Sequence, residues 1–506
     1  MALTDDINVT KNKSAFRFSS GRGKTVMADQ SRKWLTIILP LLFALLAGFL
    51  MAEKQLLGFG LLASVIAAAV LLLCILNAEI GLYIILIYSF FISFFNRLLF
   101  DNILPVGVFS DILIGVTFLG FIIRREKIAF ETKKLVNTRV GLLLVVIYLY
   151  TFFEIFNFAG LSISGFIPVI RKIVGVFLLL LISFIVFSDK KKIDRFIKVF
   201  FVSCILVAIY ACIQEWHGFF NFEMDWLRLD PRRFRMTFVN GGARRMSVFP
   251  DALSLSIVMS IASVFFTVLA LAQTSTFKRV VIFVAVALML AAMSYSLTRT
   301  ANVMFVAGIV LFVLLTVNRK TTRIFAVFGL VFFLALQFLP FGGSNQQGHF
   351  IRTLRSGTKD PSYLVRENNR KSIQPYIYVH PFGGGLSTTG DEGLTYHPNH
   401  PLAGFPPDSG YLKKALELGW IGFIIILFLY FTVIKTGISG YFSEAGPKEK
   451  MLFAACTSAL FCFYVGDFAQ VAIGQITDVV IYYPLISIIL RLPEFNSTSQ
   501  TQLQTV

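Results

Sequence analysis

Long hydrophobic runs separated by polar connections fill most of this chain of 506 residues. The runs are about 17–22 residues long, the length that an α-helix needs to cross a hydrocarbon core of about 30 Å. They predict about fourteen membrane-spanning helices. The predicted spans are 34–51, 56–76, 80–99, 106–123, 140–156, 169–188, 197–213, 251–272, 280–297, 300–317, 324–340, 411–435, 451–467 and 475–490.

The polar interval between the eleventh and twelfth predicted spans is the longest that separates two spans. It is punctuated by Gly and Pro, and large connections carry functional sites more often than spans do. We therefore expect a catalytic loop between two blocks of spans. The expected parts are a disordered cytoplasmic tail at 1–33, spans one to eleven at 34–340, a large periplasmic catalytic loop at 341–410, spans twelve to fourteen at 411–491 and a cytoplasmic tail at 492–506.

Composition narrows the class of protein. Hydrophobic residues make up 56% of the chain and charged residues only 15%. A soluble protein of this length needs more charge to cover its surface, so we expect an all-α, polytopic transmembrane helical bundle. The net charge of +18 does not indicate nucleic-acid binding, because Lys and Arg lie between the hydrophobic runs. The five cysteines lie within those runs, as small hydrophobic residues do.

Basic residues mark alternate connections and predict an orientation. The sizeable connections after even-numbered spans are basic, as in 124–134 and 190–198. Cationic connections are retained on the cytoplasmic side of a membrane. We therefore expect both termini in the cytoplasm and the 341–410 loop on the opposite side.

Two connections on the expected outer side break this rule, because they are rich in arginine. The guanidinium group offers a planar fork of donors that suits phosphate and carboxylate oxygens. An anionic ligand is one interpretation, and pairing with nearby carboxylates or lipid headgroups is the alternative. The arginines are Arg228, Arg232, Arg233, Arg235, Arg244, Arg245, Arg352, Arg355, Arg366 and Arg370, and the carboxylates are Glu215, Glu223, Asp225 and Asp230.

Arg171, Arg245 and Arg299 each stand at the expected outer end of a different pair of spans. Three cationic positions at one depth suit an anionic headgroup, although Arg299 could instead extend to the interface. Glu417 is four residues after Lys413, so a structural ion pair along one helix is an alternative to a catalytic role. His397 and His400 lack a third ligand nearby in sequence, and we expect no metal site.

Four short motifs occur in the order typical of the bacterial O-antigen ligase and polymerase superfamily, and the resemblance covers about residues 165–490. The glycine-rich run resembles the family's HP-[LF]-x-G-x-G element. The segments that carry the resemblance are Arg245 with Val248–Asp251, Thr298–Ala301, His380–Gly385, and Asp408–Leu412 followed by Glu417–Gly422.

The resemblance implies a membrane glycosyltransferase of the bacterial inner membrane. Such an enzyme moves a glycan from a polyprenyl (undecaprenyl) pyrophosphate carrier to a sugar hydroxyl of an acceptor glycan or lipid at the periplasmic face. No cofactor or metal is required, because a clamped pyrophosphate is a good leaving group and the enzyme mainly positions and stabilises charge. The expected partners are the lipid-linked glycan, the acceptor and membrane lipids.

The resemblance also implies roles for individual residues. Ligases of the family carry His where this chain has Asp408, so Asp408 is the expected base and His400 is the alternative. An aspartate starts near a pKa of about 3.9, whereas a neutral imidazole is already poised near the working pH. The expected pyrophosphate-binding residues are Arg245, Arg299, Arg171 and Arg244, and the residues expected to support the loop are Arg366, His380 and Glu417.

Three other functions stay open from the sequence. A repeat-unit polymerase of the same superfamily would use the same donor. A transporter or flippase for lipid-linked sugars would place charged residues and broken helices near the bilayer midplane. A non-catalytic assembly subunit would not need arginines on the outer side.

Overall fold

The computed structural model describes residues 55–100, 105–160, 162–239, 242–327, 361–443 and 446–504. The chain divides into two compact units, 1–72 and 73–506, and each is described by itself. In the first unit, the described residues form the start of helix α2 (Gln55–Leu76). The predicted span at 34–51 and most of the one at 324–340 lie outside the described residues.

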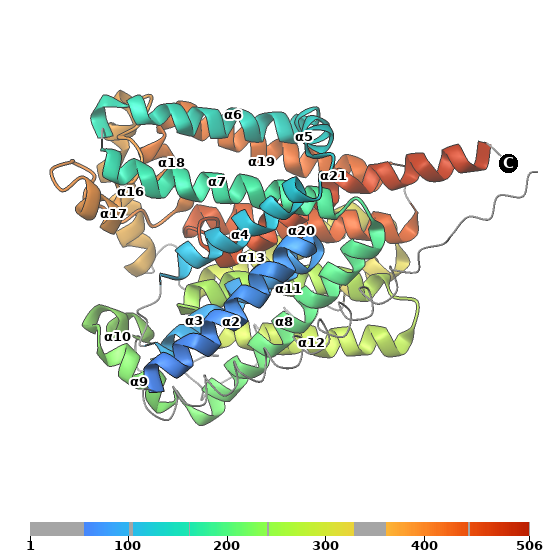
Figure 1. The fold of residues 1–506 in the computed structure, drawn as a ribbon, viewed down its shortest axis with the longest axis horizontal. Helices are drawn as coiled ribbons and strands as arrows, with labels where there is room; N and C mark the ends of the chain where they lie inside the picture. The colour runs from blue at the N-terminus through green and yellow to red at the C-terminus, as the bar shows by residue number, and fades with distance from the viewer. Residues whose placement is uncertain are drawn as a thin grey trace, which may run out of the picture. The chain divides into compact units, whose positions relative to one another are not determined.

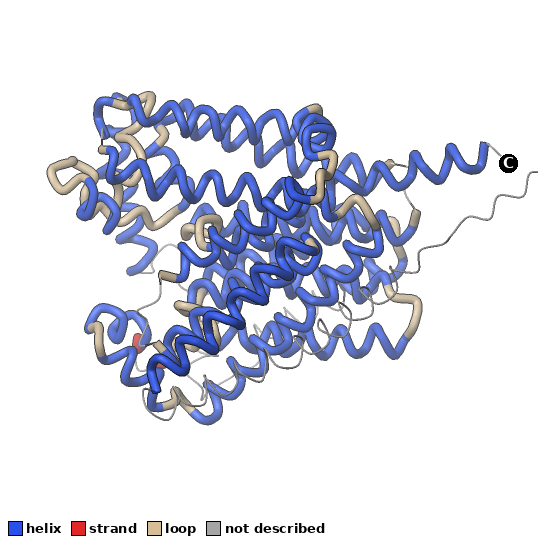
Figure 2. Tube along the Cα trace, viewed as in Figure 1, coloured by secondary structure: helices blue, strands red, loops and turns tan. Residues whose placement is uncertain are grey.

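The second unit is almost entirely helical (Figures 1 and 2). Its short β1 (Phe238–Val239) and β2 (Gly242–Ala243) pair antiparallel. The helices are α3 (Ala78–Leu99), α4 (Val106–Ile123), α5 (Ile128–Val136), α6 (Arg139–Phe153), η1 (Glu154–Phe156), η2 (Phe158–Gly160), α7 (Ile163–Val186), α8 (Lys190–His217), α9 (Asn221–Arg228), α10 (Pro231–Thr237), α11 (Ala252–Ala272), α12 (Thr276–Tyr295), α13 (Arg299–Thr316), α16 (Pro361–Val379), α17 (Gly390–Tyr396), α18 (Gly410–Glu417), α19 (Gly419–Phe442), α20 (Pro447–Ala469) and α21 (Ile476–Gln504).

Eleven helices of the described chain are long and apolar enough to cross a membrane. The prediction of an all-α, polytopic bundle is therefore confirmed. In α11 and α20, 83% of the spanning window is buried, and in α21 89%, compared with 28% in α12. Helices α11, α20 and α21 therefore form the core. Outer helices such as α12 expose apolar side chains, including Phe277, as lipid-facing helices do.

The predicted span at 411–435 is instead two helices, α18 and α19. They separate at Gly419, which has a φ of +66°. A Cβ atom at Gly419 would lie 2.0 Å from the carbonyl oxygen of Pro381. Glycine permits both the positive φ and this close approach. The polar segment before α18 therefore packs into the break, and the transmembrane helix starts eight residues later than the sequence predicted.

Polar contacts gather at two ends of the second unit. At the lysine-rich end, Lys134 of α5 pairs with Glu494 of α21 at 2.6 Å, and Lys190 of α8 pairs with Glu449 of α20. At the arginine-rich end, Arg232 of α10 pairs with an aspartate of α17 at 2.9 Å, and Arg244 bonds to the α12–α13 turn. In Figure 1, α9, α10, α16, α17 and α18 lie at the arginine-rich end, and α5 lies at the other.

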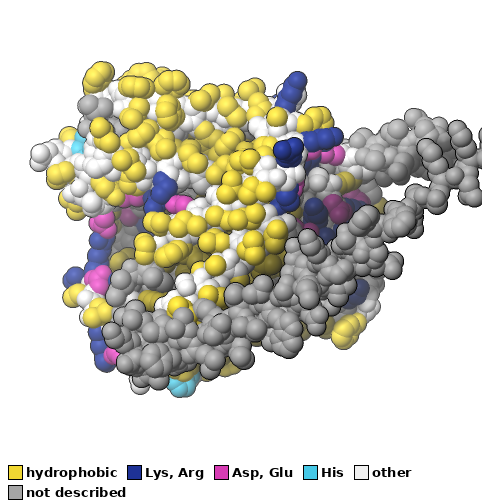
Figure 3. Space-filling model, in the orientation of Figure 1, with side chains coloured by type: hydrophobic (Ala, Val, Ile, Leu, Met, Phe, Trp, Pro, Cys, Tyr) yellow, Lys and Arg dark blue, Asp and Glu magenta, His cyan; other side chains and the backbone are white. Residues whose placement is uncertain are grey.

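The predicted connections alternate between the two sides of the membrane, and their positions in the structure agree with this. Connections expected in the periplasm meet at the arginine-rich end, and connections expected in the cytoplasm meet at the lysine-rich end. On the face shown in Figure 3, hydrophobic side chains cover much of the described surface, as expected for contact with lipid. Which end faces the periplasm stays a prediction.

Candidate functional site at the arginine-rich end

The glycine-rich turn His380–Gly385 packs directly on the α18–α19 junction. The amide of Gly384 donates to the carbonyl of Leu416 at 2.7 Å, and that of Gly385 donates to the carbonyl of Glu417 at 3.1 Å. Gly385 has a φ of +94°, and a Cβ atom there would lie 2.8 Å from the Cα atom of Gly160. The glycines are required because backbone packs on backbone. Two motifs that are distant in sequence thus form one rigid scaffold.

The three residues expected to support the loop lie in different surroundings. His380 stacks on Tyr376 with ring centroids 3.9 Å apart. Glu417 is buried, accepts a hydrogen bond from the Thr389 hydroxyl, and lies 3.8 Å from the Lys413 ammonium. Burial raises the pKa of Glu417, and the Lys413 charge and the Thr389 hydrogen bond offset only part of this. Arg366 lies on α16.

The start of α18 is fixed to the end of α20 around the buried carboxylate of Asp467. Lys414 pairs with this carboxylate, and the Tyr430 hydroxyl lies 3.3 Å from it. The Ser409 hydroxyl donates to the Asp467 carbonyl at 3.0 Å. A Cβ atom at Gly410 would overlap the carboxylate, so the glycine is needed for the approach. Lys414 therefore pairs with another helix and not with Glu417, the partner available one turn along α18.

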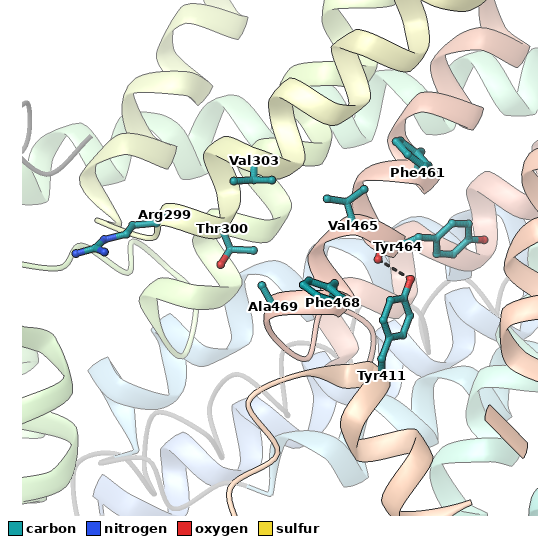
Figure 4. A pocket seen from close by; sticks show the side chains of 9 residues that line it. All are labelled: Arg299, Thr300, Val303, Tyr411, Phe461, Tyr464, Val465, Phe468 and Ala469. Carbon is teal, nitrogen blue, oxygen red and sulfur yellow. Dashed lines mark hydrogen bonds between the residues drawn. The ribbon is translucent and has the colours of Figure 1, made fainter. Parts of the chain in front are cut away.

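A cavity of about 450 Å³ lies where α13, α18 and α20 meet (Figure 4). Arg299 extends from the start of α13 to one side of it, and Tyr411 closes another side by donating to the Tyr464 carbonyl at 2.7 Å. The remaining wall is mainly aromatic and aliphatic. The lining residues are Arg299, Thr300, Val303, Tyr411, Phe461, Tyr464, Val465, Phe468 and Ala469.

Asp408 lies three residues before Tyr411, at the entrance to α18. Its Oδ2 atom accepts a hydrogen bond from the amide of Asn369 at 3.2 Å. The next residue on α16, Arg370, places its guanidinium 4.6 Å from the ring centroid of Phe468 in the cavity wall. Helix α16 therefore connects the candidate base with the cavity, a relation that the sequence did not reveal.

Two further candidate arginines are anchored at the α12–α13 turn. Arg244 donates from Nε to the Ser296 carbonyl at 3.1 Å and from Nη2 to the Thr298 hydroxyl at 2.9 Å. Burial lowers the pKa of the Arg244 guanidinium, although Asp251 opposes this. Arg245 pairs with Glu215 at 2.9 Å. The alternative of carboxylate pairing thus holds for Arg245, whereas the bonds of Arg244 in the described structure go to neutral oxygens.

The segment after Arg245 is held in place by Arg97, which sequence reasoning missed. Arg97 is buried at the end of α3 and donates to the carbonyls of Ser247, at 2.9 Å, and Phe249. Ser247 has a φ of +54°, an uncommon conformation for a residue other than glycine. The available signal was an arginine inside the hydrophobic run 80–99.

Arg171 lies apart from the cavity lining. It pairs with Asp111 of α4 at 3.0 Å, and its neighbour Lys172 pairs with Glu392 of α17 at 3.0 Å. Lys413 approaches the same carboxylate at 3.1 Å. Burial raises the pKa of Glu392, but the two ammonium groups outweigh it, so the net shift is downward.

The surroundings of His400 favour the neutral imidazole over the charged form. The Leu402 amide donates to its Nδ1 atom at 3.1 Å, so the proton of the neutral ring must lie on Nε2. Burial lowers the pKa of His400, and the neighbouring His397 and His380 lower it further. In this state His400 can donate a hydrogen bond but cannot accept a proton at Nε2. Within the described ranges, no three His, Cys, Asp or Glu residues come close enough to hold a metal ion.

The fold and the site define a multi-pass membrane protein with a cavity and a set of arginines at one end of its helical bundle. Residues 284–427 match the family model described as O-antigen ligase. This match supports the resemblance to the O-antigen ligase/polymerase superfamily that the motifs indicated. This family is glycosyltransferase-like and acts on lipid-linked glycans, which supports an enzyme at that level. No curated protein matches the chain.

Proposed function

We propose that this protein is a glycosyltransferase that moves a glycan from a polyprenyl pyrophosphate carrier to an acceptor hydroxyl at the periplasmic face, as an O-antigen ligase does. The observation that supports this most is the cavity lined by Arg299 and Tyr411, which are both in the matched segment 284–427. Its apolar wall suits the lipid side of the carrier, and the Arg299 in its lining suits the pyrophosphate.

The reaction needs a proton acceptor and a charge clamp. The acceptor oxygen bonds to the anomeric carbon, the bond from that carbon to the pyrophosphate oxygen breaks, and the carrier leaves as polyprenyl pyrophosphate. Arg299 and Arg244 stabilise the charge on the leaving group. Asp408 takes the hydroxyl proton, oriented by the Asn369 amide. His400 acts as a hydrogen-bond donor, because its Nδ1 atom is already occupied.

The other two candidate arginines, Arg245 and Arg171, can bind a phosphate only by exchanging a carboxylate partner for it. Arg245 pairs with Glu215 and Arg171 with Asp111, so each must give up part of an ion pair to bind a phosphate. We assign them a weaker contribution than Arg244, whose bonds go to neutral oxygens. Ligase and polymerase reactions share this donor chemistry and differ in the acceptor. An acceptor assay therefore decides between them.

The test uses purified protein in proteoliposomes with a polyprenyl pyrophosphate-linked glycan and a panel of acceptors. Arg299→Ala should reduce transfer by about 10–100-fold, because hydrogen bonds to charged groups contribute about 1.5–3 kcal/mol each. Arg299→Lys should recover only part, since the bidentate fork is lost. The matched control is Arg235→Ala on α10, where an exposed guanidinium bonds to the Pro231 carbonyl. Wild-type transfer by Arg299→Ala would remove this site from the mechanism.

A further inference from the structure

Arginines at this end of the bundle fall into two groups. Arg171, Arg232 and Arg245 each have a carboxylate within 3.0 Å of a guanidinium nitrogen. Arg370 has no such partner in the described part of the chain. Its Nη2 atom donates to the Phe468 carbonyl at 3.0 Å, and its charged group lies over the Phe468 ring. A carbonyl leaves the positive charge uncompensated, so the Arg370 guanidinium can still bind an anion.

Arg370 is not itself a lining residue, but its charge lies beside the cavity wall, 4.6 Å from the ring centroid of Phe468. Phe468 lines the cavity together with Ala469 and Arg299. Figure 4 shows the Arg299 side chain extending to one side of the lining, away from Phe468 and Tyr411. A guanidinium stacked on the Phe468 ring therefore adds a cation from a second direction. A pyrophosphate carries charge on two phosphoryl groups, and two cations from different elements can hold it in one orientation.

We propose that Arg370 is a second pyrophosphate-binding residue of this cavity, supplied by helix α16 of the polar segment. This inference rests on the proposed function and extends it. Asn369, its neighbour on α16, donates to Asp408 at 3.2 Å. One helix therefore carries an anion-binding group beside a residue that orients the candidate base. Binding of the donor at Arg370 would fix the position of Asp408 relative to the anomeric carbon.

The experiment measures binding of farnesyl pyrophosphate and of farnesol to the full chain in lipid nanodiscs. Arg370→Met keeps an unbranched side chain to pack on Phe468 but removes the charge. We expect about tenfold weaker binding of farnesyl pyrophosphate, equivalent to about 1.4 kcal/mol, and unchanged binding of farnesol. Arg370→Lys should recover part of the loss. Arg235→Met is the control, because its guanidinium is exposed on α10 and bonds to a backbone carbonyl.

Different outcomes overturn different claims. If Arg299→Ala weakens pyrophosphate binding and Arg370→Met does not, the role of Arg370 is wrong and the proposed function stands. If neither variant weakens binding, both claims fail. If Arg370→Met weakens farnesol as much as farnesyl pyrophosphate, the side chain acts by packing. Arg370→Gln provides a second neutral variant, and thermal unfolding of each variant shows whether the fold is retained.

Discussion

The two ends of the helical bundle differ in how some of their cations are held. At the lysine-rich end, Lys134 pairs with a carboxylate of another helix, and the buried Arg491 pairs with carboxylates of α5 and of its own helix α21. At the arginine-rich end, Arg244 and Arg370 donate to backbone carbonyls. A cation neutralised by a neighbouring helix joins the two helices. A cation that is only hydrogen-bonded to neutral oxygens keeps its charge for a ligand. Both ends contain ion pairs that join helices, as Lys414 and Asp467 do at the arginine-rich end. The comparison therefore favours Arg244 and Arg370, rather than the paired cations, as the groups available to a ligand.

The largest effect should come from the candidate base. We expect Asp408→Asn to reduce transfer by about 10²–10⁴-fold, the usual contribution of a general base, while donor binding stays unchanged. His400→Ala should reduce transfer much less, because Nδ1 of His400 already accepts the Leu402 amide. Transfer and donor binding are measured on the same preparations. A severe loss in His400→Ala beside a mild one in Asp408→Asn would move the base to His400.

A large effect on stability is expected at the buried pair of Lys414 and Asp467. This ion pair joins two helices of the arginine-rich end, as ion pairs do at the lysine-rich end. Asp467→Leu removes the counter-charge of the Lys414 ammonium. Breaking a buried ion pair in this way should lower the free energy of unfolding by about 3–5 kcal/mol. The double variant Lys414→Met with Asp467→Leu should recover most of this. Unfolding of the three variants in detergent gives the coupling between the two residues. Equal destabilisation by the single and double variants would show that the charges are not coupled.

The contacts of Glu392 predict a pH dependence. Its folded-state pKa is lowered, so the stability it contributes is present above the ordinary glutamate value of about 4.3. That stability is lost as the pH falls through the lowered value. Glu392→Gln should therefore lower the melting temperature near neutral pH and make little difference in strong acid. A constant difference across the whole range would mean that its charge has no part in holding α17.

The smallest effect is expected at the lysine-rich end. Lys134 and Glu494 are partly exposed, with 39% and 29% of their side-chain surfaces accessible. Exposed ion pairs contribute about 0–1 kcal/mol, so Lys134→Ala should change the free energy of unfolding by no more than that. Transfer activity should not change. A loss of transfer in this variant would show that the two ends do not have separate roles.

The length and composition of the hydrophobic runs predicted most of the helices. For α4 the predicted bounds 106–123 agree with the structure, because lipid contact and the ~30 Å core fix a span without help from other segments. The break at Gly419 could not be predicted in this way. It depends on the Pro381 carbonyl, which belongs to a different part of the chain and packs against that glycine.

The candidate site was predictable in its residue types and only partly in its arrangement. Arginine on the expected outer side favoured an anionic ligand over carboxylate pairing without deciding between them, and the motifs proposed Arg299 and Asp408 as candidates. The sequence offered Glu215 as one of four possible carboxylate partners but could not single it out for Arg245, since 30 residues separate them. Nor could it show that Asn369 approaches Asp408 across a separation of 39 residues. Such contacts depend on how segments distant in sequence pack together, which local pattern does not encode.

Side-specific transfer in sealed vesicles tests the central claim most directly. The sides are identified by labelling Leu394→Cys on α17 and Lys191→Cys on α8 with a membrane-impermeant reagent. The five native cysteines are buried and give little background. An impermeant acceptor is then supplied from outside. We predict transfer only in vesicles where position 394 is labelled. Transfer only in vesicles where position 191 is labelled would contradict an active site at the arginine-rich end.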